Sequence, residues 1–420
     1  MSQTAPPPTA GAPSPQTQGR DWRAVARRVA QGSAVTSVLA VVVALVLGAI
    51  LIAAANSQVQ ATAGYLFARP GDFFAALGRT IADSYSALFQ GAVVNLSASS
   101  AGDFLRPLTN TIGHAVPLIF AGLGLGIGFR AGLFNIGAQG QIIFGAIFCG
   151  YIGFAWHLPV GVHLVLCVLG AFVGGALWGF IPGILKAKTG ANEVIVTIML
   201  NSVAAFFLGW LLTREAFRKP GSSDPLSPTL DASAHYPSLF GTRANLGFVL
   251  AVAAAIGVWW LMERSTLGFA IRAVGANPAA AQTAGLSVAG ATVWTMVLAG
   301  GLAGLAATSQ LLSTSAQQLN SDVAGTFGFD AITVALLGRS KPLGTVAAGL
   351  LFGGLKAGGY LMQASTDTPI DVILVLQSVV VLLIAAPPLV KAIFHLPDED
   401  RQARKAAKQA RLALRTEATA

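Results

Sequence analysis

Long apolar segments recur along most of the chain and are separated by short polar segments. Most run for about 20 residues, the length at which an α-helix crosses the hydrocarbon core of a bilayer. A strand of a membrane β-barrel would need only about 10 residues of alternating polarity. The pattern therefore predicts transmembrane helices at about 34–55, 107–128, 141–156, 160–185, 192–212, 246–262, 288–311, 342–362 and 370–394, with a short apolar piece at 330–338.

The first apolar segment follows Arg23, Arg27 and Arg28, an order that secretory signal peptides also show. A signal peptide has an apolar core of roughly 7–15 residues, whereas this segment has about 22 and begins late in the chain. We therefore predict that it is the first membrane helix. Residues 56–106 are mixed in character, with an amphipathic stretch around 73–89, and we expect them outside the membrane.

The composition agrees with a membrane protein. Hydrophobic residues make up 54% of the chain and charged residues 10%, whereas a soluble domain carries about 25% charged residues. We predict an all-α integral membrane protein with about 8–10 transmembrane helices, some of them broken or half-length. Residues 1–32 are expected to be a disordered cytoplasmic N-terminus, 33–395 the membrane domain, and 396–420 a basic cytoplasmic tail.

The distribution of positive charge predicts the orientation. If the N-terminus is cytoplasmic and the segments alternate, 18 of the 26 Lys and Arg residues fall on the cytoplasmic side. This bias follows the positive-inside rule, so both termini are predicted to be cytoplasmic. The same topology explains the net charge of +9 without a nucleic acid partner.

Several chemistries find no support in the sequence. Cys149 and Cys167 lie in apolar segments, and the five histidines form no ligand pair, so we expect no metal site. No G-x-x-x-x-G-K-[ST] phosphate loop occurs, so we expect no ATP hydrolysis by this chain. Without a nucleophile and base pair either, the sequence predicts a protein that is not an enzyme and binds no cofactor.

Two glycine-bearing segments interrupt the pattern of full-length helices. The first, at 129–141, contains Phe134, Asn135, Gln139 and Gln141. The second, at 325–330, ends in Asp330 and precedes the short apolar piece. Glycine-interrupted and half-length helices are the best sequence indicators of a substrate path in a transporter. The alternative for the first segment is an ordinary cytoplasmic turn, which Arg130 favours.

A polar stripe marks the helix that begins near residue 192. Glu193, Thr197 and Asn201 recur every four residues and share one helical face. Such a stripe normally faces the bundle interior or a cavity. Helix capping by Asn192, with Glu193 in the first turn, is the structural alternative. Asp330 has the same two interpretations, as an N-cap or as a cavity residue.

The segment at 263–285 is too polar to span a membrane and too apolar for a free linker. A short helix with Phe269, Ile271 and Val274 beside charged residues suits docking into the groove of a partner. A helix lying on the membrane surface is the alternative. Paired glycines such as 300/304 and 349/353 predict faces where membrane helices pack closely.

Four of these segments resemble the nucleoside branch of bacterial ABC-importer permeases, within the group that handles branched-chain amino acids, sugars and nucleosides. They are FRAGLFNIGAQGQ, ANEVIVTIMLN, TLGFAIRAVGANPAAAQTAG and ALLGRSKPLG, and the resemblance covers roughly residues 117–387. Gln139 stands where an acidic residue is common. The N-terminus and the basic tail are not covered.

The resemblance implies a multi-pass permease of the bacterial cytoplasmic membrane, embedded in lipid, that imports nucleosides or a related sugar-like solute. It implies three partners: cytoplasmic ATP-binding subunits that hydrolyse ATP, a second homologous permease, and an extracytoplasmic solute-binding protein. The region at 263–285 resembles a coupling helix, whose expected contact residues are Arg264, Gly268, Arg272, Gly275, Asn277 and Pro278. The expected pathway residues are Phe134, Asn135, Gln139, Gln141, Glu193, Thr197, Asn201 and Asp330.

Two other function classes remain open at this point. The chain could be a secondary transporter driven by an ion gradient, with Glu193 and Asp330 as coupling groups. It could also be a membrane scaffold that transports nothing and uses its paired glycines as interfaces.

Overall fold

The computed structural model describes residues 33–96, 98–238, 244–313, 317–366, 368–369 and 371–385, together with residues 389 and 393. The predicted N-terminal segment and basic tail lie outside these residues. Residues 44–385 form one compact unit, and residues 1–43 with 386–420 form another. Nearly every described residue therefore belongs to the first unit.

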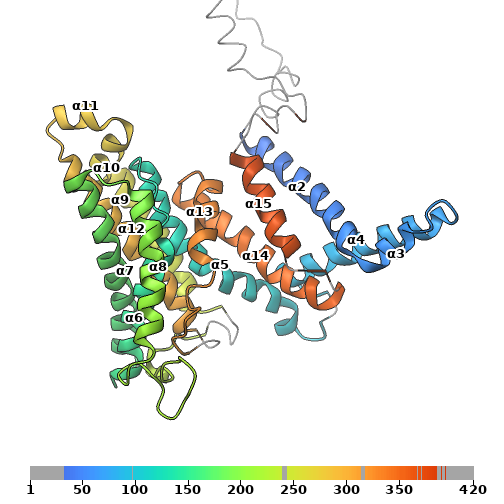
Figure 1. The fold of residues 1–420 in the computed structure, drawn as a ribbon, viewed down its shortest axis with the longest axis horizontal. Helices are drawn as coiled ribbons and strands as arrows, with labels where there is room; N and C mark the ends of the chain where they lie inside the picture. The colour runs from blue at the N-terminus through green and yellow to red at the C-terminus, as the bar shows by residue number, and fades with distance from the viewer. Residues whose placement is uncertain are drawn as a thin grey trace, which may run out of the picture. The chain divides into compact units, whose positions relative to one another are not determined.

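The described residues form α-helices, one short 3₁₀ turn and connecting loops (Figure 1). In chain order the helices are α2 (Ser33–Ala55), α3 (Ser57–Ala63), α4 (Pro70–Ala92), α5 (Ala101–Arg130), α6 (Ala138–Ala155), α7 (Val162–Thr189), α8 (Glu193–Leu211), α9 (Leu246–Arg264), α10 (Thr266–Ala276), α11 (Pro278–Thr283), α12 (Val288–Leu311), α13 (Phe327–Leu337), α14 (Pro342–Thr366) and α15 (Asp371–Ala385).

Seven of the described helices are long and apolar enough to cross a membrane, namely α5, α6, α7, α8, α9, α12 and α14. The bent pair α2 and α3, with an angle of 74° between them, would make eight. The bend follows from Asn56, whose side chain accepts hydrogen bonds from the amides of Gln58 and Val59 and so starts a new helix. The structure confirms the predicted all-α membrane fold, and α13, with 11 residues, is the predicted half-length helix.

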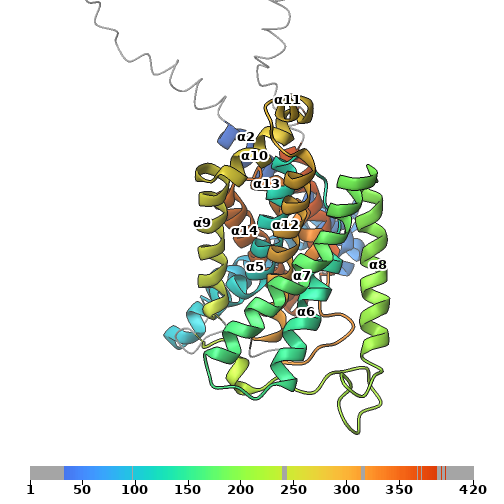
Figure 2. The same ribbon diagram turned by 90° about the vertical axis from the view of Figure 1, so that its left-hand side faces the viewer.

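Small residues bring α7 and α12 into close contact. A β-carbon at Gly300 would overlap with the carbonyl oxygen of Gly175, and one at Gly304 with that of Ala171. Membrane helices have no hydrophobic force between them, so such close backbone approach supplies the packing energy. The predicted 300/304 face is therefore confirmed as a packing face. Figure 2 shows α6, α7 and α12 side by side in this bundle.

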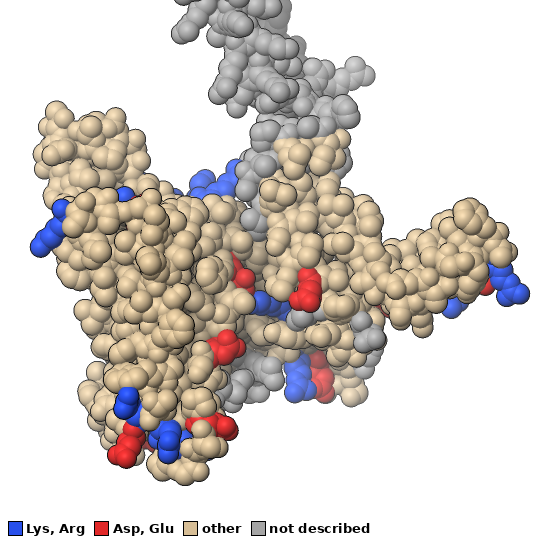
Figure 3. All heavy atoms as spheres, viewed as in Figure 1, with Lys and Arg blue, Asp and Glu red and all other residues tan. Residues whose placement is uncertain are grey.

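Helix α8 exposes one apolar face and buries its polar stripe. Phe206 is 78% exposed and Met199 is 66% exposed, whereas Thr197 and Asn201 are buried. Such a helix is suited to contact lipid on its apolar side. Figure 3 shows few charged side chains over the middle of α7 and α8. The prediction that the stripe faces the bundle interior is confirmed.

The long connection between α8 and α9 folds against the ends of the bundle helices. The Tyr236 hydroxyl donates a hydrogen bond of 2.8 Å to the Thr308 hydroxyl, and the Tyr236 amide donates one to the Leu312 carbonyl. The Asp231 amide donates to the Gly153 carbonyl. The described part of this connection is thus held by backbone hydrogen bonds at the same end of the bundle as the C-terminus of α12.

Candidate functional site

The loop between α5 and α6 is a buried bend with its own polar side chains turned inward. Asn135 and Gln141 are each 1% exposed. The Asn135 side-chain amide donates to the Gln141 side-chain oxygen at 3.1 Å, while the Asn135 side-chain oxygen accepts from the Gly137 amide at 2.9 Å. These bonds satisfy polar groups that non-helical backbone leaves open inside a membrane protein. The interpretation as a buried bend is therefore favoured over an ordinary surface turn.

The polar stripe of α8 holds the backbone of the same bend. The Asn201 side-chain oxygen accepts from the Gly140 amide at 2.9 Å, and its amide group donates to the Ile136 carbonyl at 2.9 Å. The Thr197 hydroxyl accepts from the Ile136 amide at 3.3 Å. Side chains predicted from two separate sequence segments thus form one network.

Glu193 lies at the end of this network, in the first turn of α8. Its carboxylate pairs with Lys186 of α7 at 2.6 Å and accepts a long hydrogen bond of 3.5 Å from the Phe134 amide. The Phe134 side chain is 40% exposed and lies 5.1 Å from the Phe129 ring, measured between centroids. Glu193 is therefore held by a cation and is not a free carboxylate.

Gln139 joins the two glycine-bearing breaks. Its side-chain amide donates to the Gly325 carbonyl at 2.5 Å, and its side-chain oxygen accepts from the Gly328 amide at 3.1 Å. Gly325 and Gly328 flank the start of α13, so the bend between α5 and α6 fixes where this half-length helix begins. The first break is thus bound directly to the second.

A cavity of about 440 Å³ lies beside the start of α13, and we call it the inner cavity. Its walls come from α5, α12, α14 and the segment that leads into α13. Its polar and aromatic lining comprises Asn110, His114, Asn245, Ser309, Gln310, Ser313, Asp322, Thr326, Phe327, Lys356 and Tyr360.

One ion pair stands at the wall of the inner cavity. The Lys356 ammonium donates to the Asp330 carboxylate at 2.7 Å and to the Thr326 hydroxyl at 3.0 Å, and the Thr326 hydroxyl donates to Asp330 at 2.8 Å. The Lys356 ammonium also lies 4.6 Å from the centroid of the Phe327 ring. Asp330 thus neutralises the cation that borders the cavity, and it lies behind Lys356 without lining the cavity itself.

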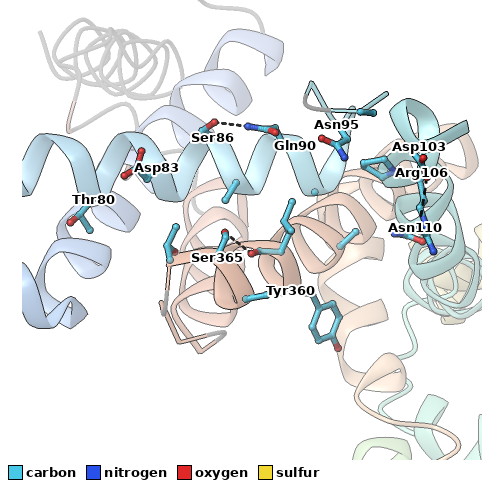
Figure 4. Close-up of a pocket in the computed structure, with 18 of the residues that line it drawn as sticks. Thr80, Asp83, Ser86, Gln90, Asn95, Asp103, Arg106, Asn110, Tyr360 and Ser365 are labelled. Carbon is cyan, nitrogen blue, oxygen red and sulfur yellow. Dashed lines mark hydrogen bonds and ion pairs between the residues drawn. The ribbon is translucent and has the colours of Figure 1, made fainter. Parts of the chain in front are cut away.

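A second, larger hollow of about 1190 Å³ adjoins the inner cavity, and we call it the polar groove. Figure 4 shows its walls: α4 carries Asp83, Ser86 and Gln90, while α5 and α14 supply the facing side chains. Asn110 and Tyr360 border both the groove and the inner cavity. The two hollows therefore meet at this pair.

The predicted coupling region forms a helical hairpin of α10 and α11 beyond the end of α9 (Figure 1). Close backbone contacts hold it: a β-carbon at Gly275 would overlap with the Arg130 carbonyl, and one at Gly268 with the Leu261 carbonyl. Glu263 pairs with Arg130 at 2.9 Å and with Arg272 at 3.8 Å. Phe269 remains 58% exposed on the hairpin.

The remaining residues of the predicted coupling set lie on the same hairpin. Asn277 caps α11 through a hydrogen bond from the Ala280 amide at 3.1 Å, and Pro278 is the first residue of that helix. Arg264 is the last residue of α9. The six residues are therefore neighbours at one end of the bundle, and their contact with a partner stays a prediction.

Sequence reasoning and structure single out different side chains around the cavity. The polar atoms of Asn135, Gln141, Thr197 and Asn201 bind protein groups, and none of these four borders either hollow among the described residues. Their expected role as pathway lining stays a prediction. The polar and aromatic lining residues that sequence reasoning missed are Asn110, His114, Asn245, Ser309, Gln310, Ser313, Asp322 and Tyr360.

A signal for three of these missed positions exists in the sequence. Asn110 and His114 are four residues apart on the apolar helix α5, and Lys356 and Tyr360 are four residues apart on α14. Polar pairs at this spacing share a helical face.

Among the described residues, no group of three or more His, Cys, Asp or Glu side chains could hold a metal ion.

The structure combines a half-length helix, a polar cavity and a helical hairpin at one end of the bundle, and comparison with known proteins shows the family. Residues 108–385 match the family described as branched-chain amino acid transport system / permease component. The chain belongs to this permease family. No solved structure matches it.

Individual relatives are ABC transporter permeases. The chain is 36% identical to the guanosine ABC transporter permease protein NupP of Bacillus subtilis over 74% of this chain and 87% of that protein. It is 33% identical to the glucose ABC transporter permease protein TsgB13 of Haloferax volcanii over 66% of this chain and 75% of the relative. It is 31% identical to the nucleoside ABC transporter permease protein NupB of Lactococcus lactis over 71% of this chain and 82% of the relative.

Family membership defines the role of the chain within a larger system. It is a multi-pass protein of the inner membrane and an ABC transporter permease, which is a transport component and not an enzyme. Such a permease works with ATP-binding and substrate-binding partners. The alternative of an ion-coupled secondary transporter is not supported, in keeping with Glu193 and Asp330 each being paired with a lysine.

Proposed function

We propose that this permease imports nucleosides through the inner cavity, driven by ATP that partner subunits hydrolyse. The single observation that carries the proposal is the chemistry of the cavity wall. Amide groups of Asn110 and Gln310 and the rings of His114, Phe327 and Tyr360 face one space. A nucleoside presents a flat base and several hydroxyl groups, which such a wall can stack and hydrogen-bond.

The size and charge of the cavity support the same solute class. Its volume of about 440 Å³ lies within the range of about 300–1,000 Å³ typical of small-molecule sites. The charge of the Lys356 ammonium is neutralised by the Asp330 carboxylate, so this lysine does not attract an anionic solute as a free cation would. An uncharged solute therefore fits better than an anion.

A glucose-like sugar is the second candidate, because one relative is named for glucose. The presence of three rings at the cavity favours the nucleoside, since a base offers a larger flat face to stack on. Uptake of labelled guanosine, uridine and glucose by the complete reconstituted transporter separates the two. ATP-dependent uptake of glucose alone would overturn the nucleoside assignment.

The cavity residues supply the direct test. We expect Gln310→Leu and Tyr360→Ala to lower ATP-dependent nucleoside uptake about tenfold, because each removes solute contacts worth roughly 1–2 kcal/mol. The matched control is Gln363→Leu, since Gln363 is an exposed residue of α14 that borders neither hollow. Equal uptake by Gln310→Leu and the control would remove the inner cavity from the path.

The partner contacts follow from the α10–α11 hairpin. ATP-binding subunits dock on this hairpin in our proposal, a second permease completes the path, and an extracytoplasmic binding protein delivers solute. The support is the exposed Phe269 on a helix that the close contacts of Gly268 and Gly275 hold firmly. Phe269→Asp should abolish co-purification of the ATP-binding subunits while the permease keeps its thermal stability. Intact co-purification would contradict this docking site.

A further inference from the structure

The polar groove is bordered by a part of the chain that the family match does not include. That match begins at residue 108, whereas much of the groove wall comes from α3, α4 and the start of α5. The side chains of α4 that face the groove are Thr80, Asp83, Ser86 and Gln90, spaced three or four residues apart on one face (Figure 4). A polar face of this kind beside an apolar bundle suits a water-filled entrance and not a lipid contact.

The direction in which the groove opens follows from α5. Asp103 and Arg106, in the first turns of α5, border the groove, while Arg130 at the other end pairs with Glu263 beside the α10–α11 hairpin. A helix of 30 residues is about 45 Å long at about 1.5 Å per residue. The groove and the hairpin thus lie toward opposite ends of a helix that is longer than the hydrocarbon core of a bilayer, about 30 Å thick. With the hairpin in the cytoplasm, the groove opens outside.

The junction between the groove and the inner cavity is made by two side chains from different helices. Asn110 of α5 and Tyr360 of α14 each border both hollows. The side-chain oxygen of Asn110 is buried and has no hydrogen-bond partner among the described residues. A buried acceptor without a partner costs free energy, and a rotation of the Asn110 side chain toward the adjoining hollows would let a passing hydroxyl or amino group satisfy it.

We propose that the polar groove is the extracytoplasmic entrance of the solute path and that Asn110 and Tyr360 form the constriction through which solute enters the inner cavity. The proposal rests on the proposed function for the identity of the solute, a nucleoside, but not for the route itself. Asn110 hydrogen-bonds the polar edge of the solute during passage, and the Tyr360 ring, 5.6 Å from that of His114 between centroids, gives the base a face to slide along.

Cysteine accessibility tests the route without reference to the solute. Cys149 and Cys167, the two cysteines of the chain, are fully buried, so the native permease chain, followed by its own mass in the complete transporter, should not react with a membrane-impermeant thiosulfonate added outside. Ser86→Cys in the groove and Gln310→Cys in the inner cavity should both react in the complete transporter. Adding Asn110→Trp should slow labelling at 310 by about tenfold, an added barrier of about 1.4 kcal/mol.

Labelling at position 86 serves as the control for folding in the same experiment. Labelling at position 86 should be unchanged by Asn110→Trp, because Ser86 lies on the outer side of the constriction. Tyr360→Ala provides an independent arm and should speed labelling at position 310. Labelling at position 310 that neither variant alters, or that occurs only from the cytoplasmic side, would overturn the route. A correct labelling pattern without nucleoside uptake would overturn only the proposed solute.

Discussion

Removing the Lys356 ammonium should destabilise the protein far more than removing an exposed lysine. In the native structure this group bonds Asp330 and Thr326, and the side chains of the ion pair are only 15% and 18% exposed. Lys356→Met leaves the Asp330 carboxylate with the Thr326 hydroxyl as its remaining side-chain partner. Breaking a buried ion pair by removing one partner costs about 3–5 kcal/mol.

The expected cost here lies near the lower end of that range. The inner cavity borders Lys356, and water in a cavity compensates part of the charge that the substitution leaves unpaired. We therefore expect Lys356→Met to lower the free energy of unfolding by about 3 kcal/mol. The double variant with Asp330→Asn removes both charges and should lie within about 1 kcal/mol of the native protein.

Unfolding by SDS in mixed micelles measures all three free energies on the same scale. Lys219→Met is the matched control, because Lys219 is exposed on the long connection between α8 and α9, and its substitution should change stability by about 0.5 kcal/mol or less. The reasoning fails if Lys356→Met is no more destabilising than the control. It also fails if the double variant is less stable than Lys356→Met alone.

Two further substitutions and one change of pH probe the bend, the hairpin and the long connection. Asn201→Ala should cost about 2 kcal/mol in unfolding free energy, because it leaves two backbone groups of the bend without partners. Gly275→Val should uncouple ATP hydrolysis from uptake, since a β-carbon there displaces α10 from α5. Burial lowers the pKa of His235 and the charge of Asp231 offsets this only partly. The folded state therefore binds fewer protons at His235 than the unfolded state does, so acidification below the ordinary histidine pKa of about 6.5 should increase proteolysis of the connection.

A specific result would contradict each of these three expectations. For the bend, an Asn201→Ala protein as stable as the native one would show that its two hydrogen bonds contribute nothing. For the hairpin, Gly257→Val is the control, because a β-carbon at Gly257 meets open space, and equal loss of coupling in both variants would exclude a contact-specific effect. For the connection, acid-induced cleavage that persists unchanged in His235→Gln would assign the pH dependence to another group.

The sequence predicted the helices well, because an apolar segment of about 20 residues that crosses a bilayer must satisfy its own backbone hydrogen bonds and so forms a helix. It also located both breaks, since glycines and amides visibly interrupt the apolar pattern at residues 129–141 and glycines do so at 325–330. The hydrogen-bond partners of those side-chain amides could not be predicted from the sequence. Asn201 faces inward by its spacing, but only the fold shows that its amide group meets the Ile136 carbonyl and the Gly140 amide.

The inner cavity was missed because it depends on pairing between distant segments. Asn110 and Tyr360 are separated by 250 residues in the sequence, and nothing local indicates that α5 and α14 place them at one junction. Lys356 is a charged residue within the span predicted at 342–362, and its spacing of four residues to Tyr360 was the available clue. Spacing gives the face of a helix, whereas the identity of the facing helix follows only from packing.

The polar side chains of the bundle divide into two groups with different tasks. One group satisfies the backbone that the broken helices leave open, and Gln139 shows why this task selects particular side chains. It donates to the Gly325 carbonyl and accepts from the Gly328 amide at the same time. An ionised carboxylate can only accept hydrogen bonds, so an acidic residue at this position could bind the Gly328 amide but would leave the Gly325 carbonyl without its donor. Gln139, in place of the common acidic residue, therefore binds backbone groups on both sides of the second break. The second group lies on the wall of the inner cavity, where our proposal places the contacts with the solute.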